Sequence, residues 1–146
     1  MKNVSTVARI LLGAGFVLFA LNYFVPFLPS PEPPPAEALP FLGAFASSGF
    51  LTLIKVIELG AGLLLLGNRL VPLALALLAP IIVGILAFHV LLAPAGIGIA
   101  AGFVVLELVL AWSYRRAFAP MLRVRVAADP MLAEGGWSPE IGTQSS

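Results

Sequence analysis

Residues 70–92 read LVPLALALLAPIIVGILAFHVLL, and within this stretch His89 is the only ionisable side chain. A helix rises about 1.5 Å per residue, so a stretch of this length can cross the roughly 30 Å of hydrocarbon in a bilayer. Pro80 removes one backbone hydrogen bond and predicts a kink, which neighbouring helices can accommodate in a membrane. The stretch therefore predicts a membrane-spanning helix.

The composition of the whole chain points to the same class. Of its 146 residues, 60% are hydrophobic and 10% are charged, and the mean hydropathy is +1.06. One soluble core cannot bury so much apolar surface, so we expect an integral membrane protein. The absence of cysteine excludes disulfides, thiolate metal sites and iron–sulfur ligation by this chain. A formal charge of +1 without an extended basic run argues against nucleic acid as a partner.

Three further stretches are apolar enough to cross a membrane, which predicts an all-α, integral membrane four-helix bundle. The expected spans are residues 4–25, 50–66, 70–92 and 97–114, within one membrane domain at 1–119. Between the first two spans we expect an external proline-rich loop, 26–49, which contains a short interfacial helix. Residues 120–146 have too little apolar content to bury a core and predict a loosely ordered cytoplasmic tail.

Basic residues near the ends of the spans predict the orientation. Those on one side of the membrane are Lys2, Arg9, Arg69, Arg115, Arg116, Arg123 and Arg125. The other side has no lysine or arginine except Lys55, which lies inside the second span. Because such residues accumulate on the cytoplasmic side, we expect a multi-pass protein of the cell (inner) membrane with both termini cytoplasmic.

Five ionisable side chains lie inside the apolar stretches, and their formal charges sum to zero when histidine is neutral: Arg9, Lys55, Glu58, His89 and Glu107. A charge at the centre of a membrane helix costs roughly 2.5 to 3.5 kcal/mol, so such residues usually face other helices and find partners. The rise of a helix places Lys55, Glu58 and His89 in the outer half of the membrane, and Asn22 reaches the same level. This shared depth predicts one polar site, with these four residues as candidate ligand-binding groups.

Three of these candidates, Lys55, Glu58 and His89, can each have either a structural or a functional role. Lys55 and Glu58 are neighbours on one helix face, so they can pair with each other and only lock the bundle, or they can bind a ligand. His89 can carry protons because it titrates near neutral pH, or it can simply donate a hydrogen bond near the interface. A single histidine cannot supply two axial haem ligands or a multi-histidine metal site, so we predict no metal site.

Two further charged residues are predicted to be buried polar groups. Glu107 lies about 15 Å below the outer boundary, close to the midplane, where a carboxylate would be protonated or paired. Arg9 is its natural candidate partner, but a long arginine side chain can also extend to the headgroups. Of these two arrangements, we expect the extension to the headgroups.

Small residues recur at positions where membrane helices can approach closely. They are Gly13 and Gly15 in the first span, Gly60 and Gly62 in the second, and the GxxxG formed by Gly98 and Gly102 in the fourth. Such spacing allows backbone contact within one bundle or between two copies of a chain. We expect internal packing.

Four segments together resemble the DoxX family of small membrane proteins: ARILLGAGFVLFALNYF, FLTLIKVIELGAGLLLLGN, VPLALALLAPIIVGILAFHVLLAP and LELVLAWSYRRAF. The resemblance covers about residues 4–120 and is most specific in the spacing of KVIE, FH and LELxLxWxYR. It implies a four-helix membrane bundle that places Lys55 and Glu58 on KVIE, His89 on FH and Glu107 on LEL. One departure is Gly84, where similar sequences often have asparagine.

Some relatives in this family are tied to quinone-linked oxidation of sulfur compounds or to membrane redox complexes. The resemblance therefore implies an accessory or quinone-interacting subunit of a membrane redox system, although the residues themselves make no cofactor evident. Expected partners are membrane lipids, a soluble or membrane redox protein, or further copies of the chain. The alternative is a non-enzymatic scaffold or a bundle that binds lipids or small molecules, because the sequence offers no nucleophile with its base and no phosphate-binding loop.

Overall fold

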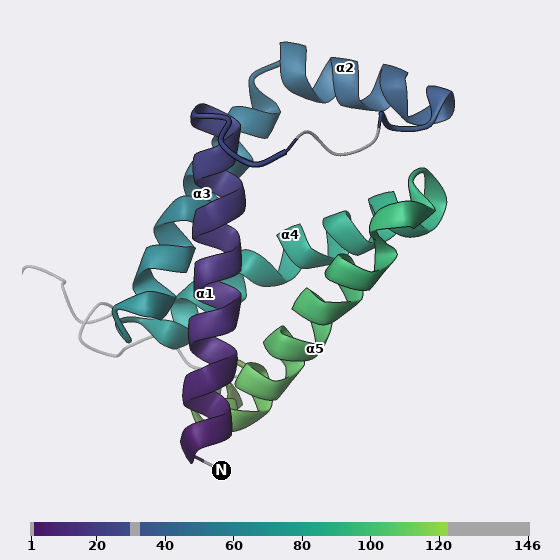
Figure 1. The fold of residues 1–146 in the computed structure, drawn as a ribbon. Coiled ribbons are helices and arrows are strands. Elements are labelled where there is room, and N and C mark those ends of the chain that lie inside the picture. The colour runs from purple at the N-terminus through teal and green to yellow at the C-terminus, as the bar shows by residue number, and fades with distance from the viewer. Residues whose placement is uncertain (1, 30–32, 123–146) are drawn as a thin grey trace, which may run out of the picture.

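The computed structural model describes residues 2–29 and 33–122, and this part of the chain is built from helices and turns, with no strand (Figure 1). The long helices are α1 (Lys2–Phe24), α3 (Phe50–Leu66), α4 (Val71–Leu91) and α5 (Ile97–Ser113). The short ones are η1 (Ala36–Ala38), α2 (Leu39–Ser47), η2 (Pro94–Gly96), α6 (Arg115–Phe118) and η3 (Ala119–Leu122). The prediction of an all-α fold is confirmed for the described residues, whereas the predicted tail from residue 123 onward lies outside them.

Three helical stretches are long and apolar enough to cross a membrane: Asn3–Phe24, Val71–Leu91 and Pro94–Ser113. At 17 residues α3 is shorter, and it passes the same test only together with Ala36–Ser47, from which it is bent by 77°. The described residues thus contain three candidate membrane spans, or four if the bent pair is one span. This result supports a multi-pass membrane protein, and α3 coincides with the range predicted for the second span.

Gly49 makes the sharp bend between α2 and α3. Its φ of 75° is a left-handed conformation that glycine adopts without a steric cost. As a result α2 does not continue the line of α3 but lies across one end of the α1 and α3 pair (Figure 1). The sequence predicted a short helix here, and the bend places that helix over the space between α3 and α4.

The closest helix packing in the described residues is between α1 and α3, which run side by side (Figure 1). A Cβ atom on Gly13 would lie 3.0 Å from the carbonyl oxygen of Gly62. A Cβ atom on Gly62 would lie at the same distance from the carbonyl oxygen of Gly13. Gly15 is covered by the ring of Phe103 from α5. Internal packing is therefore confirmed for these three glycines: Gly13 and Gly62 let the backbones of α1 and α3 touch, and Gly15 makes room for an aromatic ring.

The same prediction is wrong for the other three glycines of the pattern. Added Cβ atoms on Gly60, Gly98 and Gly102 would meet nothing within 4 Å. The GxxxG of α5 points away from the rest of the chain, because α5 packs against α1 and α4 through other residues, among them the buried Ala100 and Leu110.

Candidate ligand-binding site

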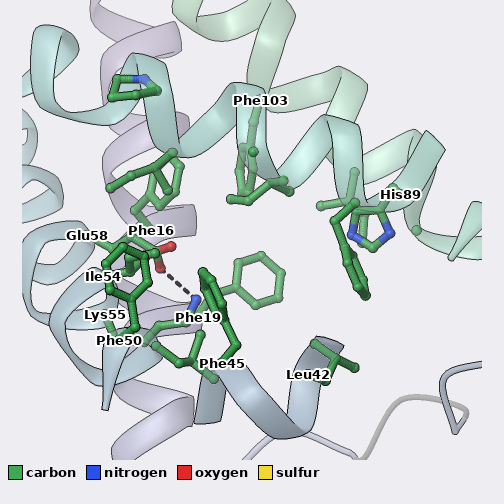
Figure 2. A pocket seen from close by; sticks show the side chains of 18 of the residues that line it. Phe16, Phe19, Leu42, Phe45, Phe50, Ile54, Lys55, Glu58, His89 and Phe103 are labelled. Carbon is green, nitrogen blue, oxygen red and sulfur yellow. Dashed lines mark hydrogen bonds and ion pairs between the residues drawn. The ribbon is translucent and has the colours of Figure 1, made fainter. Parts of the chain in front are cut away.

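A cavity of about 770 Å³ lies beneath α2, between the α1 and α3 pair and helix α4 (Figure 2). Its lining includes seven of the ten phenylalanines of the chain: Phe16, Phe19, Phe41, Phe45, Phe50, Phe88 and Phe103. Small-molecule sites typically enclose about 300 to 1,000 Å³ and combine apolar walls with a few placed polar groups. The cavity has the size and the apolar character of such a site.

Pairs of phenylalanine rings join the helices around the cavity. The rings of Phe16 and Phe103 stack with their centroids 4.8 Å apart, which connects α1 to α5. Phe41 of α2 stacks on Phe88 of α4 at 5.8 Å, and Phe45 of α2 meets the edge of Phe50 at 5.1 Å. These contacts hold α2 over the cavity and give the cavity flat aromatic walls.

An ion pair forms the polar part of the wall contributed by α3. The Lys55 Nζ donates a hydrogen bond of 2.7 Å to Oε2 of Glu58, as the spacing in the sequence predicted. The Glu58 side chain is only 2% exposed, whereas that of Lys55 is 19% exposed. Because an ammonium group has further N–H donors, Lys55 can hold Glu58 and still donate to a ligand.

His89 of α4 lines the cavity on the side that faces Lys55 and Glu58 (Figure 2). Its Nδ1 lies 2.9 Å from the carbonyl oxygen of Ala93. A carbonyl oxygen can only accept, so Nδ1 carries a proton and donates, and in the neutral ring Nε2 is then an acceptor. The structure thus brings Lys55, Glu58 and His89 around one cavity but on facing walls, and no hydrogen bond among the described residues joins His89 to the ion pair.

Asn22 does not line this cavity, although it was predicted at the same depth. Its Oδ1 accepts hydrogen bonds from the backbone N–H groups of Phe27 and Leu28, at 2.9 and 2.8 Å. The side chain therefore turns toward its own chain and closes the turn that follows α1.

Arg9 and Glu107 are not paired with each other within the described part of the chain. The Arg9 Nη1 donates to the carbonyl oxygen of Leu65 and, at 3.3 Å, to that of Leu66. These carbonyls belong to the last turn of α3, and that of Leu65 also accepts from the backbone N–H of Asn68 at 3.1 Å. Arg9 thus caps α3, an arrangement that the sequence did not predict. The Oε2 of Glu107 is buried and has no hydrogen-bond partner among the described residues.

Two glycines shape the cavity although neither was predicted as a site residue. An added Cβ atom on Gly96 would overlap the ring of His89, so the absence of a side chain makes room for the imidazole. An added Cβ atom on Gly84 would meet nothing within 4 Å, so this residue widens the cavity next to His89. The contact between Gly96 and His89 depends on how α4 and α5 pack, so no local sequence signal could have identified it.

The described residues 2–29 and 33–122 contain no group of three or more His, Cys, Asp or Glu side chains that could hold a metal ion. No family model, curated protein or solved structure matches the chain.

Proposed function

We propose that this protein is a DoxX-like four-helix membrane bundle of the inner membrane that binds a quinone in the cavity beneath α2, as an accessory subunit of a membrane redox system. The observation that carries the proposal is the combination of phenylalanine walls with hydrogen-bonding groups on facing sides. The residues proposed to contact the quinone head are Lys55 and His89, with Glu58 holding Lys55 in place.

The shape of a quinone head supports this choice. The head is a flat ring with two carbonyl oxygens at opposite positions, and flat rings stack well on aromatic side chains. In the proposed pose the Lys55 ammonium donates to one carbonyl oxygen. His89 faces the other oxygen, where its Nε2 accepts a hydrogen bond from the hydroxyl group of the reduced form.

The charge balance of the cavity supports a neutral ligand. Lys55 and Glu58 cancel each other at 2.7 Å, and His89 is the only other ionisable side chain in the described lining. A charged ligand would have to leave water without gaining a free counter-ion, which is costly in an apolar environment. A neutral head with an apolar tail avoids that cost.

The proposal assigns binding to this chain and electron transfer to a partner protein. The chain has no cysteine, and its described residues form no metal-ligand cluster. Its own groups supply a stacking surface, one ammonium donor and one imidazole that can take a proton from a reduced quinone.

A variant that fills the cavity tests binding directly. Gly84→Leu adds a side chain to the open space in the cavity, whereas Gly60→Leu adds the same side chain to an open position away from it. With a short-chain ubiquinone and protein in lipid nanodiscs, we expect Gly84→Leu to weaken binding at least about tenfold, a difference of about 1.4 kcal/mol, and Gly60→Leu to leave it unchanged. Equal binding by both variants and by the wild-type protein would contradict the proposal.

A second measurement separates a redox role from binding alone. Oxidation of a reduced quinone is followed in membranes that carry the wild-type protein, His89→Ala or no protein. We expect slower turnover with His89→Ala than with the wild-type protein. Quinone binding in nanodiscs together with identical turnover in all three membranes would favour the alternative, a bundle that binds a lipid or small molecule without a redox role.

A further inference from the structure

A second cavity, of about 390 Å³, is lined by residues from the start of α1 and the end of α5. These two helix ends lie at the end of the molecule opposite α2 (Figure 1). Its walls come from the start of α1, the turn after α3 and the junction between α5 and α6. The lining residues are Ser5, Thr6, Arg9, Asn68, Ser113, Tyr114 and Arg115. Polar and basic side chains predominate here, in contrast to the phenylalanine walls of the larger cavity.

Both arginines of this cavity are held by backbone carbonyls. Arg9 binds the last carbonyls of α3, and the Arg115 Nη1 donates to the carbonyl oxygen of Trp112 at 3.1 Å. The Arg115 guanidinium also lies over the Trp112 ring, 5.0 Å from its centroid. These contacts position both guanidinium groups but use only some of their N–H donors. The remaining N–H groups can donate to a ligand.

The two positive charges have no counter-ion in the described structure. None of the described lining residues is acidic, and neither arginine forms an ion pair with a described carboxylate. The hydroxyl groups of Ser5 and Tyr114 add neutral hydrogen-bonding groups to the same cavity. Fixed guanidinium groups with nearby hydroxyls are the donor set that binds phosphate oxygens well.

The surroundings of the cavity indicate that the phosphate is carried by a lipid. Trp112 is 66% exposed and Leu108, one turn earlier on α5, is 63% exposed, so an apolar face leads up to Arg115. Exposed tryptophan is typical of the depth of the headgroups, and basic cavities between membrane helices on the cytoplasmic side bind anionic headgroups. An acyl chain can then follow α5 while the phosphate enters the cavity.

We propose that this cavity binds the phosphate group of an anionic phospholipid, with Arg9 and Arg115 as its main ligands. The proposal is independent of the quinone cavity, which lies at the other end of the molecule and shares no lining residue with this one.

The test uses the full chain in detergent, titrated with phosphatidylglycerol or with phosphatidylcholine and followed by native mass spectrometry. We expect the wild-type protein to bind the first phosphatidylglycerol about tenfold more tightly than phosphatidylcholine, because both lipids carry the phosphate but the cationic choline group of the second is repelled by Arg9 and Arg115. Arg115→Gln should remove this preference. Arg116→Gln removes the same charge from the neighbouring residue, which does not line the cavity, and should keep the preference.

A pair of serine variants that each introduce one negative charge provides a second, independent test. Ser5→Asp places a negative charge inside the cavity and should abolish the preference for phosphatidylglycerol, whereas Ser48→Asp, at the other end of the molecule, should not. An equal loss in Arg115→Gln and Arg116→Gln would overturn the proposal, because only overall charge would then matter. Displacement of the lipid by millimolar inorganic phosphate would overturn the assignment to a lipid and identify a site for a soluble anion.

Discussion

Gly96 lies directly against the imidazole of His89, so closely that a Cβ atom on residue 96 would overlap the ring. On the same side, the carbonyl oxygen of Ala93 holds Nδ1 at 2.9 Å. A glycine and a carbonyl from the turn between α4 and α5 therefore fix where the only histidine of the chain meets the cavity.

Gly96→Ala should displace the His89 ring and weaken binding of the reduced quinone as much as His89→Ala does, because Nε2 of the neutral ring accepts from the hydroxyl of that form. The φ of −89° at Gly96 lies outside the left-handed region, so the backbone conformation does not require glycine. Gly98→Ala, where an added Cβ atom meets nothing within 4 Å, is the matched control and should bind normally. Binding titrations in nanodiscs check this, and normal binding by Gly96→Ala would show that the ring position is unimportant.

Lys55→Met should lower the free energy of unfolding by about 3 kcal/mol, because it leaves the buried Glu58 carboxylate without its partner. Lys55→Met combined with Glu58→Leu removes both charges and should regain most of that stability. Unfolding titrations in mixed detergent micelles measure both effects.

The same double variant separates the two interpretations of the ion pair. If Lys55 contacts the quinone, the double variant folds stably but binds quinone poorly. Normal binding by the stable double variant would mean that the pair only locks the helices together.

Gly62→Ala and Gly60→Ala should change stability in opposite directions. A Cβ atom on Gly62 would lie 2.9 Å from Cγ2 of Val17 and 3.0 Å from the carbonyl oxygen of Gly13, so α1 and α3 must move apart, at a cost of about 1 to 3 kcal/mol. A Cβ atom on Gly60 meets nothing, and alanine there should gain up to about 1 kcal/mol from helix propensity. Thermal unfolding of the two variants provides the comparison, and equal shifts would contradict the close contact between α1 and α3.

Arg9→Met should destabilise the protein by about 1 to 3 kcal/mol, because the Leu66 carbonyl loses its side-chain donor and the Leu65 carbonyl keeps only the bond from the backbone N–H of Asn68. Arg9 is not bonded to Glu107, so a double-mutant cycle with Glu107→Gln should give a coupling energy below about 0.5 kcal/mol. A coupling energy well above 1 kcal/mol would instead show that Arg9 and Glu107 interact directly.

Single cysteines test the predicted orientation without a background signal, because the chain has no cysteine of its own. Glu37→Cys lies next to α2 and Arg116→Cys lies at the opposite end, and both positions are exposed. A membrane-impermeant maleimide should label Glu37→Cys in intact cells but Arg116→Cys only after permeabilisation. The reverse pattern would place the termini outside.

Several features of the fold follow from the sequence because they depend on neighbouring residues only. Residues 50–66 are apolar between two glycines, and α3 occupies that range. Lys55 and Glu58 pair because helical geometry puts residues three apart on one face whatever the helix packs against. Depth along a span also follows from the sequence, since each residue adds a fixed rise.

The direction in which a side chain points around its helix was decided only by the tertiary structure. Asn22 and His89 were predicted at one depth, yet Asn22 turns to its own chain while His89 lines the cavity. Arg9 meets α3 rather than Glu107, and Gly98 faces outward, because the rotation of each helix is set by how its whole surface packs. The amino-acid sequence by itself thus determined which segments are apolar helices and which charges they carry. Contacts between helices distant in the chain, above all at Gly13 with Gly62 and at Gly96 with His89, decided where those charges meet a cavity.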